Sequence, residues 1–170
     1  MCIRDRLLSL FVTASLLGFS QTDTKTETYK AENDGWLVKI DEAYAESKKT
    51  GKPILANFTG SDWCGWCKRL TKSVFVKDDF KKWADENVIL LELDFPRRKQ
   101  LPQAIRQQNA QLQQAFRVSG YPTIWVFNLD KDDKGQFQIE GLGKTGYRKT
   151  VDEFTNDVER MFANAKKDKG

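Results

Sequence analysis

The sequence contains no histidine and only three cysteines, which limits the metal chemistry open to it. A structural zinc site normally takes four Cys or His ligands. Cys64 and Cys67 lie three positions apart, and Cys2 lies in an N-terminal segment whose removal we expect. The remaining chain therefore cannot complete a zinc site by itself, although a site shared between two chains stays open. We expect no bound metal and no cofactor.

Runs of basic residues interleaved with aromatic residues, which are typical of nucleic-acid-binding surfaces, are also missing, and the net charge is only +4. Nucleic acid is therefore not an expected partner. No internal repeat or long linker divides the 170 residues, of which 31% are charged and 39% are hydrophobic. This composition predicts one soluble globular domain, which we expect to be a monomer.

The N-terminal apolar run covers residues 7–17, which is too short to predict a membrane span. Two arginines precede it, and small residues suited to a cleavage site end at Ser20. Residues 1–20 are therefore predicted to be a signal peptide and residues 21–35 a flexible lead-in. No cysteine ends the run, so no lipid anchor is expected. The mature chain should have no membrane span and should be periplasmic or secreted.

Cleavage would leave Cys64 and Cys67 as the only cysteines, so they could pair only with each other. A disulfide that closes so small a loop adds little stability. In an oxidising compartment the pair is therefore better explained as a redox device than as a structural staple. A predicted buried strand at residues 54–58 precedes the pair, and a predicted helix at residues 68–74 follows it. At a helix start, the unpaired N–H groups and the helix dipole favour a thiolate.

The motif Ser-Asp-Trp-Cys-Gly-Trp-Cys at residues 61–67 resembles the active site of thioredoxin-family thiol:disulfide oxidoreductases. It is most similar to the secreted bacterial thiol:disulfide interchange branch of that family. The resemblance covers residues 36–165, and we place a thioredoxin-like domain at residues 36–166. It implies an α/β, thioredoxin-like fold, in which helices flank a central mixed β-sheet.

The pattern of apolar residues predicts a compatible order of elements. Helices are expected at residues 41–49, 68–74, 79–86, 102–116 and 151–165, and strands at residues 54–58, 88–95, 123–127 and 136–142. Asp78 is expected to cap the third helix, and Thr150 with Glu153 to form a capping box for the last. Alternating helices and strands, followed by a hairpin and a closing helix, predict a sheet with both parallel and antiparallel pairs.

Cys64, nearer the helix start, is expected to be the attacking thiolate, and Cys67 the resolving thiol that breaks the mixed disulfide. In the Gly-Tyr-Pro-Thr sequence at residues 120–123, Pro122 lies where the family carries a cis-proline. An ordinary trans proline is the alternative, because only about 5–6% of X-Pro bonds in folded proteins are cis. By the resemblance, the Tyr121 backbone would pair with an extended substrate strand. Pro122 would keep metals and misplaced donors away from the sulfurs.

The predicted substrate-binding residues are Trp63, Gly65, Trp66, Tyr121 and Pro122. In this family the residue before the first cysteine and those between the two cysteines are largely exposed. We therefore expect the aromatic residues of this set to form an apolar docking rim, since exposed aromatic residues usually mark contact sites. The alternative is that they fill the core.

Two departures from the family pattern affect the chemistry. The buried acid that the family often carries on the strand before the motif is missing, because the candidate positions hold Asn57 and Phe58. Proton transfer is then left to water, to the substrate or to Asp62, which we expect to be exposed. The dipeptide between the cysteines is Gly-Trp and lacks the proline or histidine of other branches. We therefore expect a moderately lowered Cys64 pKa and a reducing to intermediate potential.

Three functions are compatible with these features. The first is an exported thiol:disulfide oxidoreductase that acts on protein clients and exchanges electrons with an unidentified thiol-disulfide donor or acceptor. The second is a binding or chaperone-like module whose cysteines are incidental. The third is a specialised enzyme on the same scaffold, such as a peroxide- or metallochaperone-linked thiol protein. The cysteine motif favours the first.

Overall fold

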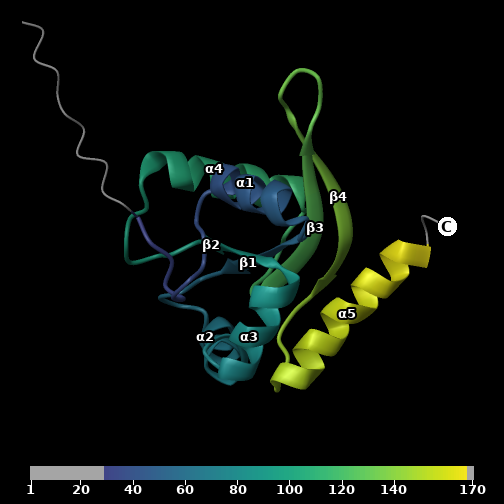
Figure 1. The fold of residues 1–170 in the computed structure, drawn as a ribbon. Coiled ribbons are helices and arrows are strands. Elements are labelled where there is room, and N and C mark those ends of the chain that lie inside the picture. Colours follow the sequence, from purple (N-terminus) through teal and green to yellow (C-terminus); the bar gives the residue numbers. More distant parts are fainter. Residues whose placement is uncertain (1–28, 168–170) are drawn as a thin grey trace, which may run out of the picture.

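A mixed β-sheet forms the centre of the computed structural model, which describes residues 29–167 (Figure 1). Its four strands lie in the order β2-β1-β3-β4. They are β1 (Ile54–Thr59), β2 (Ile89–Asp94), β3 (Thr123–Lys131) and β4 (Phe137–Thr145). β1 pairs in parallel with β2 and antiparallel with β3, and β3 and β4 form an antiparallel hairpin. The central strand β1 leads directly into the cysteine motif.

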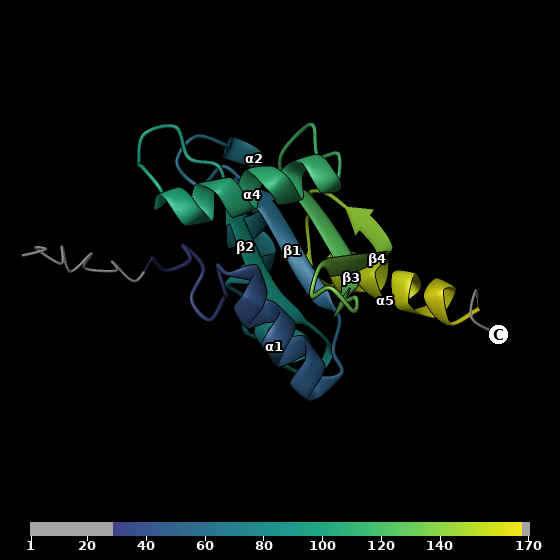
Figure 2. The same ribbon diagram turned by 90° about the horizontal axis from the view of Figure 1, so that it is seen from above.

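Helices cover both faces of this sheet (Figure 2). One face is covered by α1 (Ile40–Thr50) and α4 (Gln103–Ala115). The other face is covered by α2 (Gly65–Leu70), the π-helical turn η1 (Thr71–Phe75), α3 (Asp78–Asn87) and α5 (Val151–Lys167). Each face therefore has its own apolar core. The cysteine pair lies at the start of α2, on the face that α2, α3 and α5 cover.

The alternation of side chains along β1 decides which residues point towards the cysteine pair. Phe58 packs in the core under α1 and α4, whereas Leu55 packs in the opposite core. Because successive side chains of a strand point to opposite faces, Asn57 points to the face covered by α2. The parallel register pairs Asn57 with Glu92 of β2, so Glu92 points to that face as well.

The predicted fold class is confirmed, and the differences lie at the ends of elements. β3 continues beyond residue 127 because it pairs with β4 along the whole hairpin. The helix after the cysteines begins at Gly65 and passes into the π-helical turn. The prediction that Asp78 caps α3 was wrong, because the N-cap is Lys77 and Asp78 is the first helical residue. At that position its carboxylate still interacts favourably with the positive end of the helix dipole.

The predicted capping box at the start of α5 is present in a shifted form. The Thr150 hydroxyl accepts a hydrogen bond from the Glu153 N–H at 3.2 Å, as the pattern requires. The Glu153 carboxylate reaches back one residue further, to the Lys149 N–H at 2.9 Å. The first bond satisfies a donor that the first turn of the helix leaves unpaired, and the second holds the residue that precedes the cap.

The predicted signal peptide at residues 1–20 lies outside the described residues, as does the first part of the predicted lead-in at residues 21–35. The described end of that lead-in packs on the domain. Asn33 is buried there, and both its N–H and its side-chain amide donate to the Glu92 carboxylate. This contact joins residues far apart in the chain, so no local sequence pattern predicts it. From residue 29 to residue 167, no helix is both long enough and apolar enough to cross a membrane.

Candidate active site

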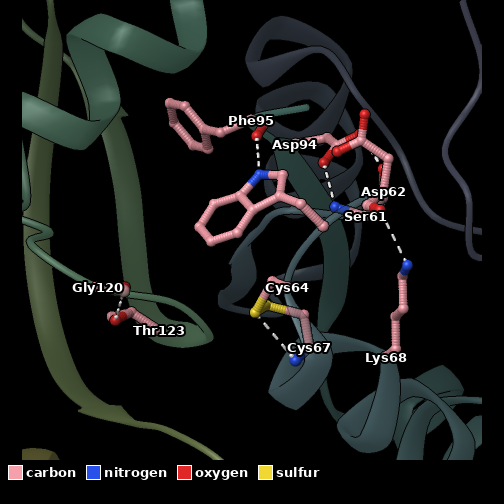
Figure 3. The surroundings of a disulfide bond; sticks show 10 residues. Ser61, Asp62, Cys64, Cys67, Lys68, Asp94, Phe95, Gly120 and Thr123 are labelled. Atoms are coloured by element: carbon pink, nitrogen blue, oxygen red, sulfur yellow. Dashed lines mark hydrogen bonds between the residues drawn. A yellow bond between two sulfur atoms is a disulfide. The ribbon is translucent and has the colours of Figure 1, made fainter. Parts of the chain in front are cut away.

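Cys64 and Cys67 form a disulfide at the start of α2, with their Cα atoms 5.3 Å apart (Figure 3). Cys64 is the N-cap of this helix, and its sulfur accepts a hydrogen bond from the Cys67 N–H at 3.2 Å. The same N–H would stabilise a thiolate on Cys64, because hydrogen bonds to a charged acceptor are stronger than those to a neutral one. In this oxidised form Cys64 is 5% exposed and Cys67 is 3% exposed. Only a small edge of the disulfide therefore reaches the surface.

Trp63 fixes the position of the chain just before the disulfide. Its indole N–H donates to the Phe95 carbonyl at 2.8 Å, and its ring packs edge-on against Tyr121 with ring centres 5.8 Å apart. A Cβ atom added to Gly60 would lie only 2.5 Å from the indole, so glycine is required at this position. The Arg97 guanidinium lies 3.8 Å from the ring centre. Trp63 is thus a half-buried anchor.

Trp66, in contrast, lies on the surface. Its side chain is 52% exposed, and the adjacent Gly65 is exposed as well. The ring packs against Tyr147, with ring centres 5.0 Å apart, and the Arg69 guanidinium lies 4.8 Å from its centre. The residues predicted as an aromatic rim therefore fall into two kinds, since Trp66 is exposed whereas Trp63 packs inward.

The loop that precedes β3 lies beside the cysteine motif. Its Tyr121–Pro122 peptide bond is cis, the isomer implied by the family resemblance. The Thr123 hydroxyl donates to the Gly120 carbonyl at 2.8 Å, which closes the loop (Figure 3). Tyr121 is half-buried, and its hydroxyl accepts a hydrogen bond from Gln113 at 2.6 Å. Burial raises the pKa of Tyr121, so this hydroxyl stays protonated at neutral pH.

Asp62 is occupied by the backbone of the segment that follows β2. Its carboxylate accepts hydrogen bonds from the Arg97 N–H at 3.0 Å and the Arg98 N–H at 2.6 Å. Desolvation raises its pKa, but these backbone N–H groups outweigh it, so the net pKa lies below the ordinary value for aspartate. A carboxylate with a lowered pKa is a weaker base, which makes Asp62 a poor proton acceptor. Its role here is to hold the loop.

Glu92 is a buried acid that the sequence did not reveal. It is 1% exposed, and its carboxylate accepts hydrogen bonds from the Glu32 N–H at 2.7 Å and from the Asn33 amide at 2.7 Å. Desolvation by burial raises its pKa, and these hydrogen bonds offset part of that rise. Glu92 and Cys67 line the same cavity of about 200 Å³, together with Thr59 and other residues.

The two candidate positions for the family acid now differ in orientation. Phe58 is buried on the opposite face of the sheet, where it stacks on Phe95. Asn57 points to the α2 face, and within residues 29–167 its side-chain oxygen is buried without a hydrogen-bond partner. The acid is thus missing from β1, and a carboxylate is supplied by its neighbour on β2. A glutamate within an apolar strand was the available signal, but only the strand register places Glu92 beside Asn57.

Comparison with known proteins identifies the family. Residues 40–146 match the family described as a thioredoxin-like domain. The chain belongs to the thioredoxin-like family. This confirms the resemblance that was inferred from residues 61–67. Within the described part of this thioredoxin-like chain, no group of three or more His, Cys, Asp or Glu side chains is placed to hold a metal ion.

Relatives of this thioredoxin-like chain carry names from thiol-disulfide chemistry. It is 32% identical to the disulfide bond reductase DsbH of Chlamydia pneumoniae over 123 residues. These aligned residues make up 72% of this chain and 74% of the relative. It is 28% identical over 142 residues to the thioredoxin-related protein DsbJ of the same organism, but spans only 40% of that protein. A solved structure of a DsbH oxidoreductase matches with a TM-score of 0.64 at 30% identity, covering 77% of this chain and 85% of the other.

Proposed function

We propose that this chain is an exported thiol:disulfide oxidoreductase that reduces or exchanges disulfides in protein clients through Cys64 and Cys67. The observation that carries the proposal is the disulfide at the start of α2, next to the Tyr121–Pro122 loop, in a chain of the thioredoxin-like family. A curated relative and a solved structure, both named DsbH and both spanning most of this chain, support the same chemistry.

The first step uses the reduced protein, in which both cysteines are free. The Cys64 thiolate attacks one sulfur of a client disulfide, and the other client sulfur leaves as a thiolate. This forms a mixed disulfide between Cys64 and the client. Cys64 is the better attacking group because its sulfur receives the Cys67 N–H and because Cys64 caps the N-terminus of α2. The Tyr121 backbone and Pro122 line the other side of the client strand.

The second step resolves the mixed disulfide. The Cys67 thiol loses its proton and attacks the Cys64 sulfur, and the client sulfur leaves as a second thiolate. Two electrons have then passed from the protein to the client, and the Cys64–Cys67 disulfide is restored. A thiol-disulfide partner of the cell reduces it again. Running the same steps backwards oxidises a client.

Glu92 is the group best suited to accept the proton of Cys67. Both residues line one cavity of about 200 Å³, which is large enough for water to bridge them. The raised pKa of Glu92 brings its proton affinity closer to that of a thiol, which favours transfer. The pKa of Asp62 is shifted in the opposite direction, and Asp62 does not line the cavity that Cys67 shares with Glu92. We therefore assign Glu92, rather than Asp62, to this step.

The location follows from the predicted signal peptide at residues 1–20, which would deliver the chain to an oxidising compartment. There the protein is expected to act as a monomer on protein thiols and disulfides. A turnover assay tests the proposal: the reduced protein, with a small dithiol as electron source, should reduce a model disulfide-bonded protein catalytically. A double variant with Cys64→Ser and Cys67→Ser should show only the rate of the dithiol alone. If the wild type shows no more, the chain is a binding module and not an oxidoreductase.

A further inference from the structure

The surface around the disulfide carries basic side chains that form no ion pair with the carboxylates of the described residues. They come from two segments and are all exposed: Lys68, Arg69 and Lys72 from α2 and η1, and Arg97 and Arg98 from the segment after β2. Among the described residues, none of the five forms an ion pair. We call these five residues the basic rim.

Two arginines of the basic rim contact tryptophans of the cysteine motif. The Arg97 guanidinium lies 3.8 Å from the centre of the Trp63 ring, and the Arg69 guanidinium lies 4.8 Å from that of Trp66. A guanidinium stacked on an aromatic face keeps its N–H groups available at its edges, where they suit a carboxylate. The two cations therefore lie beside the aromatic rings of the cysteine motif.

Negative charge near the basic rim is already engaged. Asp62 is the carboxylate of the cysteine motif, and it accepts the backbone N–H groups of Arg97 and Arg98. Asp62 thus holds the segment that carries Arg97 and Arg98, and its carboxylate oxygens point to the backbone of that segment. Asp94 is buried and bound to Ser61 and Lys99. Neither carboxylate pairs with a guanidinium of the basic rim.

We propose that the basic rim binds acidic segments of partner proteins, with a carboxylate on each side of the reacting cysteine. The proposal rests on the function proposed above and specifies the partner of the same site. Arg97 and Arg69 stack on Trp63 and Trp66, the residues that flank and separate the two cysteines, so both cations lie close to any chain joined to Cys64. Carboxylates then form charge-assisted bonds with the guanidinium edges. Opposite charge also speeds the encounter of the partners.

Three peptides of equal length test this inference. Each holds one intramolecular disulfide. The residues beside its two cysteines are acidic in the first peptide, neutral in the second and basic in the third. At low salt, reduced protein should reduce the acidic peptide about fivefold faster than the neutral one, as expected for two exposed charge pairs, and the basic peptide should be slowest. Added salt should remove the differences. Equal rates for all three peptides at low salt would overturn the proposal while leaving the oxidoreductase function intact.

Charge-removal variants connect the effect to the rim. Arg69→Gln with Arg97→Gln should remove most of the preference for the acidic over the neutral peptide, and the remainder should come from Lys68, Lys72 and Arg98. Lys134→Gln is the matched control, because this exposed residue lies in the hairpin between β3 and β4, far from α2 (Figure 1). A loss of the preference in the control as well would contradict a local rim.

A binding measurement keeps the inference testable even if the protein fails to turn over. Dye-labelled linear peptides with serine in place of cysteine are titrated with the oxidised protein, and fluorescence anisotropy gives the dissociation constants. The acidic peptide should bind several-fold more tightly than the neutral one, and the Arg69→Gln, Arg97→Gln double variant should lose most of this difference. Vesicles with and without phosphatidylglycerol form the second arm. Binding to anionic vesicles without any preference among the peptides would refute the protein partner in favour of a lipid surface.

Discussion

Replacing Glu92 by glutamine tests the assigned proton acceptor. The substitution keeps the shape of the side chain but removes its negative charge and one acceptor oxygen. In the folded protein that oxygen pair accepts the N–H groups of Glu32 and Asn33 and the Asn33 amide. Glutamine would place its NH₂ group against one of these donors. One buried N–H left without a partner costs about 1–3 kcal/mol, which a domain of ordinary stability tolerates.

The stability change should depend on pH, and its sign follows from the raised pKa of Glu92. A carboxyl group whose pKa is higher in the folded than in the unfolded protein stabilises the fold only while it is protonated. The free energy of unfolding therefore falls as the pH rises from the ordinary glutamate value through the folded pKa. Glu92→Gln removes this fall. Denaturant unfolding at several pH values should show a flatter profile for the variant.

The kinetic effect should fall on one step. Attack by Cys64 does not use Glu92, so the mixed disulfide should form at the normal rate. Its resolution by Cys67 should slow by about 100-fold, the lower end of general-base contributions. Rapid acid quenching followed by mass spectrometry should then show the mixed disulfide accumulating in Glu92→Gln. In the wild type the rate of resolution should rise with pH through the pKa of Glu92, and the variant should lack that inflection.

Glu32→Gln is the matched control, because Glu32 lines the same cavity and its side chain is 54% exposed. It should leave the resolution rate within about twofold, as expected for an exposed carboxylate with little effect on a buried thiol. If Glu92→Gln and Glu32→Gln behave alike, or if attack and resolution slow equally, Glu92 is not the proton acceptor.

Three further changes have expected outcomes of their own. Cys67→Ser should trap mixed disulfides with clients and Cys64→Ser should trap none, as detected on non-reducing gels; the reverse pattern would exchange their roles. Trp66→Ala should change the free energy of unfolding by less than about 1 kcal/mol, because the ring is half exposed, yet slow reduction of a protein disulfide more than that of a small disulfide. Gly60→Ala should destabilise the fold by about 1–3 kcal/mol through overlap with Trp63; unchanged thermal unfolding would show that the ring can move.

The fold and the reactive pair were predictable because their signals are local. An apolar strand, a C-x-x-C motif and a following helix occupy one short stretch, and the family resemblance extends from there to Pro122. The π-helical turn at residues 71–75 was not predictable, since it differs from an α-helix in its i→i+5 hydrogen bonds, which have no signal in the apolar pattern. Asp78 was assigned as a cap from residue type alone, although the helix begins one residue earlier than that pattern implied.

The buried acid escaped prediction for a different reason. Glu92 belongs to the strand beside β1, and its position opposite Asn57 depends on the register of two strands that lie far apart in the sequence. Its hydrogen bonds to Asn33 add a third distant segment. Local sequence patterns predict individual helices and strands, whereas the partners of a buried carboxylate depend on how the strands pair and how distant segments pack on them.

The anchoring of Trp63 has a consequence for the order of events in the catalytic cycle. Its contacts with Gly60, Phe95 and Tyr121 join three segments into one packed surface beside the sulfurs. This surface presents the same shape to each partner protein, and only a small edge of the Cys64–Cys67 pair is exposed. In the proposed exchange reaction, client and electron donor react with this same cysteine pair in turn, which predicts ping-pong kinetics in which an excess of either competes with the other.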